Sequence, residues 1–277
     1  MDQYTILNAK ENKAILLNCN DLKPKYIDID FGEFEILLLD TNVKHNLAST
    51  EYNTRVKECN QALKTINRVN DKKHENLSMV SLEEINDAKN DLSTNQFKRA
   101  IFVYNENRRA VKSAELIEKN NLSEFGKLMY QSHDGLKNNY EVSCKELDFL
   151  VNQTKKINGI IGARMMGGGF GGCTVNLIKS NEIDEIVSKI KENYKSNFGI
   201  NLKAIIANPG SGINVVRIWI NFDINLNMKR TVTEAIEYRR SVRKYLDTDL
   251  NEEKVKNCIK NATLAPNSSN MQLWEFY

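Results

Sequence analysis

The 277-residue sequence has no uninterrupted apolar run that approaches the roughly 20 residues of a membrane span. No basic segment followed by an apolar core comes after Met1, so the sequence predicts neither a membrane helix nor a signal peptide. The net charge is only +3, and no dense Lys/Arg patch with interleaved aromatic residues occurs. This composition argues against nucleic acid or a membrane as a partner.

Paired cysteines are also missing. The five cysteines are odd in number, scattered and free of CxxC spacing; they are Cys19, Cys59, Cys144, Cys173 and Cys258. In a chain of this size such thiols are typical of a reducing compartment and not of disulfides or zinc ligands. We therefore expect a cytoplasmic enzyme of one large or two ordinary domains, with no metal held by its own side chains.

Glycine, in contrast, is concentrated in one stretch. Seven of the thirteen glycines fall between Gly159 and Gly172, in the sequence GIIGARMMGGGFGG. Glycine is used where the backbone takes a positive φ or where another group approaches it closely. Apolar, β-branched segments flank the run, which predicts a strand, a glycine turn and a second strand. A flexible linker would carry serine and polar spacers, so we expect a shaped backbone surface beside a ligand, with amides that could support a phosphate.

The rest of the chain up to residue 218 predicts an α+β fold, a sheet with helices. Three apolar runs at its start, 14–19, 26–29 and 34–40, predict strands of one sheet, the last buried on both sides. Helical periodicity begins at residue 47, with Val56 on its buried side, and recurs in a long helix with Val111 in its buried stripe. Ser81 and Glu84 form a capping-box pattern. The further predicted helices are 97–119, 123–136, 144–156 and 183–197, and the further strands are 203–207 and 213–218.

The composition of the sequence changes after residue 218. A run rich in Asn and Asp, 219–227, predicts a linker, and 228–277 reads as a second, mainly helical segment. Residues 273–277 begin a strand that has no sheet partner near it in the sequence. We therefore expect a chain that starts inside one fold and stops inside another.

Three polar patches in the first 218 residues are candidates for chemistry. Asp2 lies in a short polar and aromatic turn, where a carboxylate could act as a base toward a hydroxyl, although a solvated side chain is the simpler interpretation. The segment 41–52, TNVKHNLASTEY, leads from a buried strand into a helix, a preferred place for ligands. The alternative to a ligand-binding role for this segment is a capped helix with solvated Lys44 and His45. The glycine stretch is the third patch.

Together these patches resemble the galactokinases of the GHMP small-molecule kinase superfamily. The matching segments are Met1-Asp2-Gln3, the strand AILLNC, residues 41–52, YEVSCKELDFL at 140–150 and GARMMGGGFGGCTV at 162–175. The resemblance covers residues 1–218 and corresponds to the C-terminal two-thirds of such a kinase. It implies transfer of a phosphoryl group from ATP, with Mg²⁺, to the anomeric hydroxyl of galactose.

The resemblance also implies roles for particular residues. Asp2 corresponds to the catalytic carboxylate, and Tyr52 to a tyrosine that helps hold the sugar. Met166 stands where the family more often has threonine. The residues that correspond to the glycine-rich motif near the substrates are Gly162, Arg164, Gly167, Gly168, Gly169 and Gly171.

Two motifs of the family do not occur in these 277 residues. They are the Gly-Glu-His-x-Asp motif with the catalytic arginine and the Gly-Leu-Ser-Ser-Ser phosphate loop. We therefore expect this chain alone to have little or no kinase activity. The alternatives are a protein that binds sugar or nucleotide without turnover, or one that complements a separately encoded N-terminal half.

The tail 228–277 carries RRSVR at 239–243 and, after one predicted helix, APNSSNMQLW at 265–274. With these two segments it resembles the beginning of an FMN-dependent nitroreductase. In that family an Arg/Ser patch binds the FMN phosphate, for which such donors are well suited, and a second segment lines the flavin site. Leu273 replaces the usual proline, and the simpler interpretation of RRSVRK is a solvated helix end. A flavin-binding oxidoreductase fragment is thus the second functional hypothesis, although a tail with half a site is not expected to hold FMN. The candidate residues are Arg239, Arg240, Ser241, Arg243, Pro266, Ser268, Asn270 and Gln272.

Overall fold

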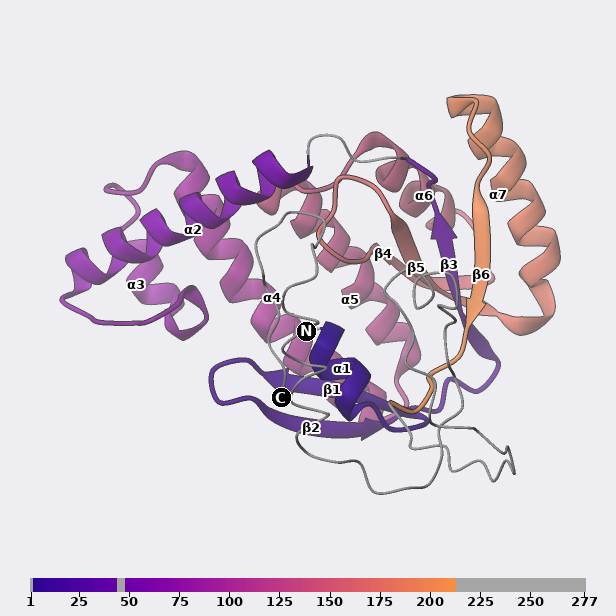
Figure 1. Ribbon diagram of the computed structural model, residues 1–277, viewed down its shortest axis with the longest axis horizontal. Helices are drawn as coiled ribbons and strands as arrows, with labels where there is room; N and C mark the ends of the chain where they lie inside the picture. Colours follow the sequence, from indigo (N-terminus) through magenta and orange to yellow (C-terminus); the bar gives the residue numbers. More distant parts are fainter. Residues whose placement is uncertain (1, 44–47, 213–277) are drawn as a thin grey trace, which may run out of the picture. The chain divides into compact units, whose positions relative to one another are not determined.

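The computed structural model describes residues 2–43 and 48–212 (Figure 1). The strand predicted at 213–218, the linker and the nitroreductase-like tail lie outside the described residues. The helices are α1 Asp2–Asn8, α2 Ala48–Asn70, α3 Leu82–Asp87, α4 Thr94–Glu118, α5 Leu122–Gly135, α6 Lys145–Thr154 and α7 Ile183–Phe198. The strands are β1 Lys13–Asn18, β2 Lys23–Asp28, β3 Phe34–Asp40, β4 Ile160–Met165, β5 Cys173–Lys179 and β6 Lys203–Ala207. The predicted α+β class is confirmed.

The six strands form two antiparallel sheets, not one. Among the described residues β1 and β2 pair only with each other, whereas β3 lies inside a four-stranded sheet of order β4-β5-β3-β6 (Figure 1). The prediction that the first three strands share a sheet was therefore wrong. β2 carries Pro24, which cannot donate to a ladder, while the uninterrupted apolar run of β3 suits a central position. Separation of β3 from β2 places the end of β3 beside the glycine stretch.

The two faces of the four-stranded sheet are covered differently. Leu37 and Leu39 of β3 pack with Tyr194 in a core formed with α6 and α7. Ile36 and Leu38 point to the other face and are only half-buried, so the prediction of full burial on both sides is only partly met. On that face α5 packs against the edge strand β4, where Gly126 meets Gly162 backbone to backbone.

A second core joins α2, α3 and α4 through residues such as Ile66, Ile85 and Ala100. The predicted capping box at the start of α3 is present, with Ser81 and Glu84 bonded reciprocally. Val56, expected on the buried face of α2, is 41% exposed because the helix instead buries its neighbour Arg55. Val111 is 50% exposed, since its part of α4 borders a groove between α4 and α5.

The N-terminal segment is a helix and not the predicted turn. In α1, the Asn8 side chain donates to the Tyr4 carbonyl, and the Tyr26 hydroxyl donates to the Asn8 carbonyl at 2.8 Å. The Asn8 carbonyl is at the C-terminal end of this short helix, so the bond from Tyr26 satisfies a group that the helix itself leaves unpaired. The hydrogen bonds that fix α1 thus come from its own last turn and from β2.

Candidate functional site

The glycine stretch forms a β-hairpin, as predicted. β4 and β5 pair up to Met165 opposite Thr174, and the loop 166–172 connects them. Its backbone takes positive φ angles at Gly167, Gly169, Phe170, Gly171 and Gly172. Only glycine adopts such angles freely, so the composition of the loop follows from its backbone shape.

The middle of the hairpin loop is pressed against the backbone before α6. A Cβ at Gly169 would lie 2.1 Å from the Val142 carbonyl oxygen, and the Phe170 amide donates to the same oxygen at 2.6 Å. At Gly167, Gly168 and Gly172, in contrast, an added Cβ would meet nothing within 4 Å. The loop is therefore fixed at its centre and leaves bare backbone open beside it, a surface that a ligand can approach closely.

The end of the loop is joined to the end of β3. The amide and the hydroxyl of Thr41 both donate to the Gly172 carbonyl oxygen, at 2.9 and 2.8 Å. Thr41 is fully buried, and its own carbonyl accepts a bond from the Tyr194 hydroxyl at 2.8 Å. Two of the three polar patches, the segment that begins at Thr41 and the glycine loop, are therefore neighbours.

The start of the loop is held by two side chains. The Met165 amide donates to Nδ1 of His133 at 3.3 Å, and the Met165 carbonyl accepts a bond from Arg164 Nε at 2.9 Å. The Arg164 guanidinium also lies 3.7 Å from Glu106 of α4, and burial lowers the pKa of Arg164. It lines a cavity of about 320 Å³ between α4, α5 and the sheet. Arg164 thus belongs to the support of the loop and extends toward the helices.

His133 is itself held by a polar cluster at the start of α6. Its Nε2 lies 3.2 Å from Asp148 Oδ1, which also accepts a bond from the Ser143 hydroxyl at 2.7 Å, while Lys137 Nζ is 2.9 Å from Oδ2. Burial alone would raise the pKa of Asp148, but the contacts with His133, Lys137 and Ser143 outweigh it and lower the pKa to about 2. The Asp148 carboxylate is therefore ionised at neutral pH.

The lowered pKa of Asp148 predicts a pH-dependent contribution to stability. A carboxyl group whose pKa is lower in the folded state stabilises the protein above its unfolded pKa, here 3.8, and this contribution is lost as the pH falls toward about 2. We expect Asp148→Asn to lower the free energy of unfolding by about 2 kcal/mol at neutral pH. Urea unfolding from neutral to acidic pH should show the difference from the unsubstituted chain shrinking only below about pH 4.

Asp134→Asn is the matched control for Asp148→Asn. Asp134 is exposed and its partner Lys155 lies 3.2 Å away on the surface, so its loss should cost less than about 1 kcal/mol. A difference for Asp148→Asn that stays constant through the acid range would contradict the role given to this carboxylate.

A buried arginine network connects α2 to the backbone that holds the loop. Arg99 of α4 is fully buried and donates to Glu58 and Glu141, each at 2.7 Å, and to the Asn139 carbonyl. Arg55 of α2 donates to the Tyr140 and Glu141 carbonyls at 2.8 and 3.0 Å. Glu141 adopts a left-handed conformation, and the next residue, Val142, carries the oxygen that the loop contacts.

The structure places the side chain of Tyr52 but not that of Asp2. Tyr52 lies near the start of α2, one turn before Arg55, and is 56% exposed. α2 therefore presents this phenol to solvent while the arginine network fixes the helix. The backbone of Asp2 begins α1, but its side chain lies outside the described part of the structure, as do Lys44 and His45.

The residues that frame the loop, His133, Asp148, Arg99 and Glu141, were not among the predicted site residues. Glu141 and Asp148 fall within the matching segment 140–150, so a signal for them existed. Nothing in the sequence distinguishes Arg99 from the other arginines of the same helix, Arg108 and Arg109.

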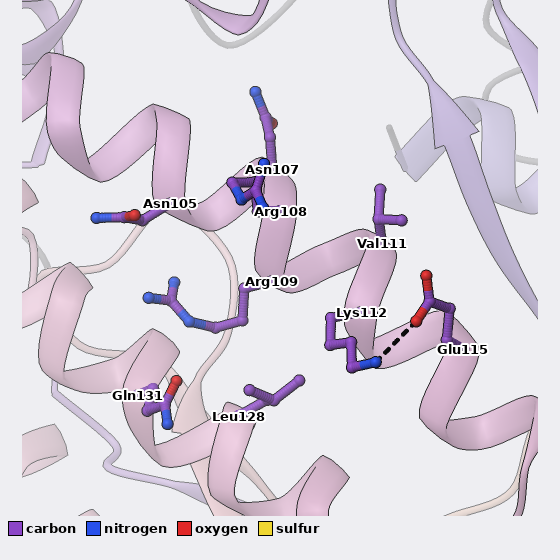
Figure 2. Close-up of a pocket in the computed structure, with 9 residues that line it drawn as sticks. All are labelled: Asn105, Asn107, Arg108, Arg109, Val111, Lys112, Glu115, Leu128 and Gln131. Atoms are coloured by element: carbon purple, nitrogen blue, oxygen red, sulfur yellow. Dashed lines mark hydrogen bonds and ion pairs between the residues drawn. The ribbon is translucent and has the colours of Figure 1, made fainter. Parts of the chain in front are cut away.

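A groove of the described residues lies elsewhere, between α4 and α5 (Figure 2). It measures about 710 Å³, and none of the residues that line it belongs to the three patches. Two of its cations are paired, Arg109 with Glu106 and Lys112 with Glu115 at 2.9 Å, the latter visible in Figure 2. We do not assign it to the candidate site.

Two features of the described residues bear on the type of site. No group of three or more His, Cys, Asp or Glu side chains gathers there in a way that could hold a metal ion. None of the helices described is long and apolar enough to cross a membrane.

Comparison with known proteins defines the class. Residues 113–196 match the family described as GHMP kinases C terminal, and residues 236–277 match the nitroreductase family. The first of these matches spans α5, the hairpin and most of α7.

The chain is also similar to galactokinases. Galactokinase from Clostridium beijerinckii is 45% identical over 200 residues, which make up 72% of this chain and 51% of that protein. Galactokinase from Clostridium tetani is 41% identical over 200 residues, 72% of this chain and 50% of that protein. The crystal structure of Lactococcus lactis galactokinase complexed with galactose superposes with a TM-score of 0.71 and 33% identity, covering 76% of this chain and 54% of that one.

Both predicted resemblances, to galactokinase and to nitroreductase, are confirmed by these matches. The chain spans about half the length of the curated relatives it matches, and not the two-thirds that the sequence predicted.

Proposed function

We propose that the galactokinase-like region serves the transfer of a phosphoryl group from ATP to the anomeric hydroxyl of galactose. The proposal is supported by the identity to galactokinases and by the fold shared with a galactose-bound galactokinase. The observation that carries it is the hairpin loop, which is fixed at Met165, Phe170 and Gly172 while its backbone beside Gly167 and Gly168 stays open. Phosphoryl transfer depends mainly on positioning and electrostatics, and a rigid loop of bare backbone provides positioning.

Three groups of this chain take named roles in the proposal. Asp2 is the carboxylate that accepts the proton of the sugar hydroxyl or orients it. Tyr52 contacts the sugar, for which its exposed position on α2 leaves it free. The loop amides support the phosphates. Mg²⁺ would enter with ATP as part of the substrate, since no described cluster of side chains offers a site for the ion.

We further propose that this 277-residue chain turns over slowly by itself and is completed by a polypeptide that supplies the Gly-Glu-His-x-Asp and Ser-rich phosphate-loop motifs, neither of which it contains. Loss of such electrostatic elements lowers rates by on the order of 10³-fold or more. Galactose-dependent release of ADP, followed in a coupled assay, should therefore be at least about 10³-fold slower than for an intact galactokinase.

The decisive experiment mixes the chain with the complementary half of the Clostridium beijerinckii galactokinase, with Asp2→Asn as the control. Activity that appears on mixing and is lost in Asp2→Asn supports the proposal. Rapid turnover by the chain alone, abolished in Asp2→Asn, would show that it needs no partner. A chain that binds galactose but gains no activity with a folded partner would be a binding protein and not half of a kinase.

A second candidate function rests on the match of residues 236–277 to the nitroreductase family. It predicts a yellow protein that takes up FMN and is reduced by a nicotinamide cofactor. Arg239→Ala and Arg243→Ala should then weaken FMN binding, because both cations would contact the phosphate. Colourless protein that does not retain added FMN would exclude this function for the chain.

A further inference from the structure

The proposed function does not use one buried, titratable side chain at the end of β4. His133 is in the last turn of α5 and is 2% exposed. It reaches β4 because α5 and β4 touch through glycine, with the Gly126 and Gly162 backbones in direct contact. One ring nitrogen meets the Met165 amide and the other faces Asp148.

Met165 needs such a partner because β4 is an edge strand. The Met166 amide donates to the Cys173 carbonyl of β5. Because the direction of the backbone groups alternates along a strand, the amide and carbonyl of Met165 point to the free edge. Met165 is fully buried, and a buried amide without an acceptor is strongly unfavourable. The His133 ring accepts from the amide and the Arg164 side chain donates to the carbonyl. Two side chains thus close the edge of β4 where the glycine loop begins.

This geometry fixes the tautomer of the ring. A nitrogen that accepts a hydrogen bond carries no proton, so neutral His133 carries its proton on Nε2. Nε2 lies 3.2 Å from the Asp148 carboxylate but makes no aligned hydrogen bond among the described residues, so this attraction is chiefly electrostatic. Lys137 and Ser143 hold the carboxylate on its other sides.

We propose that His133 is a positioning residue for the glycine loop: Asp148 fixes its tautomer, and its bare Nδ1 fixes Met165 at the point where the loop leaves β4. Gly167 and Gly168, the open part of the loop, follow within three residues of this anchor. The consequence for phosphoryl transfer rests on the proposed function, whereas the anchoring of the loop does not.

Two substitutions separate the contacts of the two ring nitrogens. In His133→Asn the amide oxygen lies close to the position of Nδ1 and can accept from Met165, whereas in His133→Gln the longer side chain reaches toward Asp148 and leaves Met165 without an acceptor. Both remove the ring, so both create a similar cavity. Hydrogen exchange of the Met165 amide and of segment 166–172, measured on the full chain, is the readout.

We expect the Met165 amide to exchange about tenfold faster in His133→Gln than in His133→Asn, after correction for global stability measured on α7 amides. Equal exchange in the two variants would overturn the proposal. So would a long-range ¹H–¹⁵N spectrum of the unsubstituted chain that places the proton on Nδ1, and this measurement remains decisive if both variants fail to fold. If mixing with a complementary half restores kinase activity, His133→Gln should lower kcat more than the KM for galactose; if it does not, the exchange result still stands.

Discussion

Arg99→Ala is expected to lower the free energy of unfolding by about 3–5 kcal/mol, a large fraction of the stability of an ordinary domain. Arg99 is fully buried and donates hydrogen bonds to two carboxylates and one carbonyl. Burial alone would lower the pKa of Arg99, but its hydrogen bonds to Glu141 and Glu58 outweigh this and raise it. Arg99 bridges the carboxylates of Glu58 and Glu141, and Glu58 is itself largely buried. Removal of the guanidinium takes away the cation that these two carboxylates share.

Two further variants test the origin of that loss. Lys112→Ala removes a cation from the same helix whose partner Glu115 is exposed, and it should cost less than about 1 kcal/mol. Arg99→Lys keeps the charge but cannot reach three acceptors with one ammonium group, so it should fall between the two. Urea unfolding followed by circular dichroism measures all three. If Arg99→Ala were as mild as Lys112→Ala, the network would not be what holds α2 and α4 to residues 139–141.

The position of Arg99 connects stability to the candidate site. Arg99 donates to the Glu141 carboxylate and Arg55 donates to the Glu141 carbonyl. Together they hold Glu141 in its left-handed conformation. The next carbonyl, that of Val142, accepts from Phe170 in the glycine loop. The network therefore fixes, through one short segment, both the helix that carries Tyr52 and the centre of the loop.

The sequence was most informative where local backbone chemistry decides the structure. The hairpin at 159–178 could be predicted because glycine adopts positive φ angles most readily and occupies all but one of the positive-φ positions of the loop, and β-branched residues flank it. The α3 cap could be predicted because Ser81 and Glu84 bond within one turn. Strand β6 agrees with its prediction at both ends.

Where distant residues decide the structure, the sequence was less informative. Periodicity cannot show that α2 buries Arg55 and exposes Val56, because the acceptors for Arg55 lie some 85 residues away, at Tyr140 and Glu141. It likewise cannot show that β3 pairs with β5 and β6 and leaves β2, since that choice depends on strands far along the chain. His133 had no local signal, because its role depends on Met165 at the edge of another element.

Gly126→Ala is the second prediction with a large expected effect, and its sign runs against helix propensity. Alanine in a helix interior is favoured over glycine by about 1 kcal/mol. At Gly126, however, an added Cβ would lie 2.0 Å from the Ile161 carbonyl oxygen, and the facing residue is Gly162, so backbone would have to move apart on both sides. Overpacking against backbone costs about 1–3 kcal/mol or more, which exceeds the gain in propensity. We expect a net loss of at least about 1–2 kcal/mol, measured by urea unfolding.

Gly135→Ala, in the same helix, is the matched control. Its Cβ would meet only the Phe102 ring at 3.2 Å, a side chain that can shift by a few tenths of an ångström, so the variant should be nearly neutral. Separation of α5 from β4 also draws His133 away from Met165, so Gly126→Ala should speed hydrogen exchange in the glycine loop while Gly135→Ala leaves it unchanged. Should Gly126→Ala stabilise the chain, helix propensity would outweigh the contact, and the close α5–β4 packing that brings His133 to the loop would not be required.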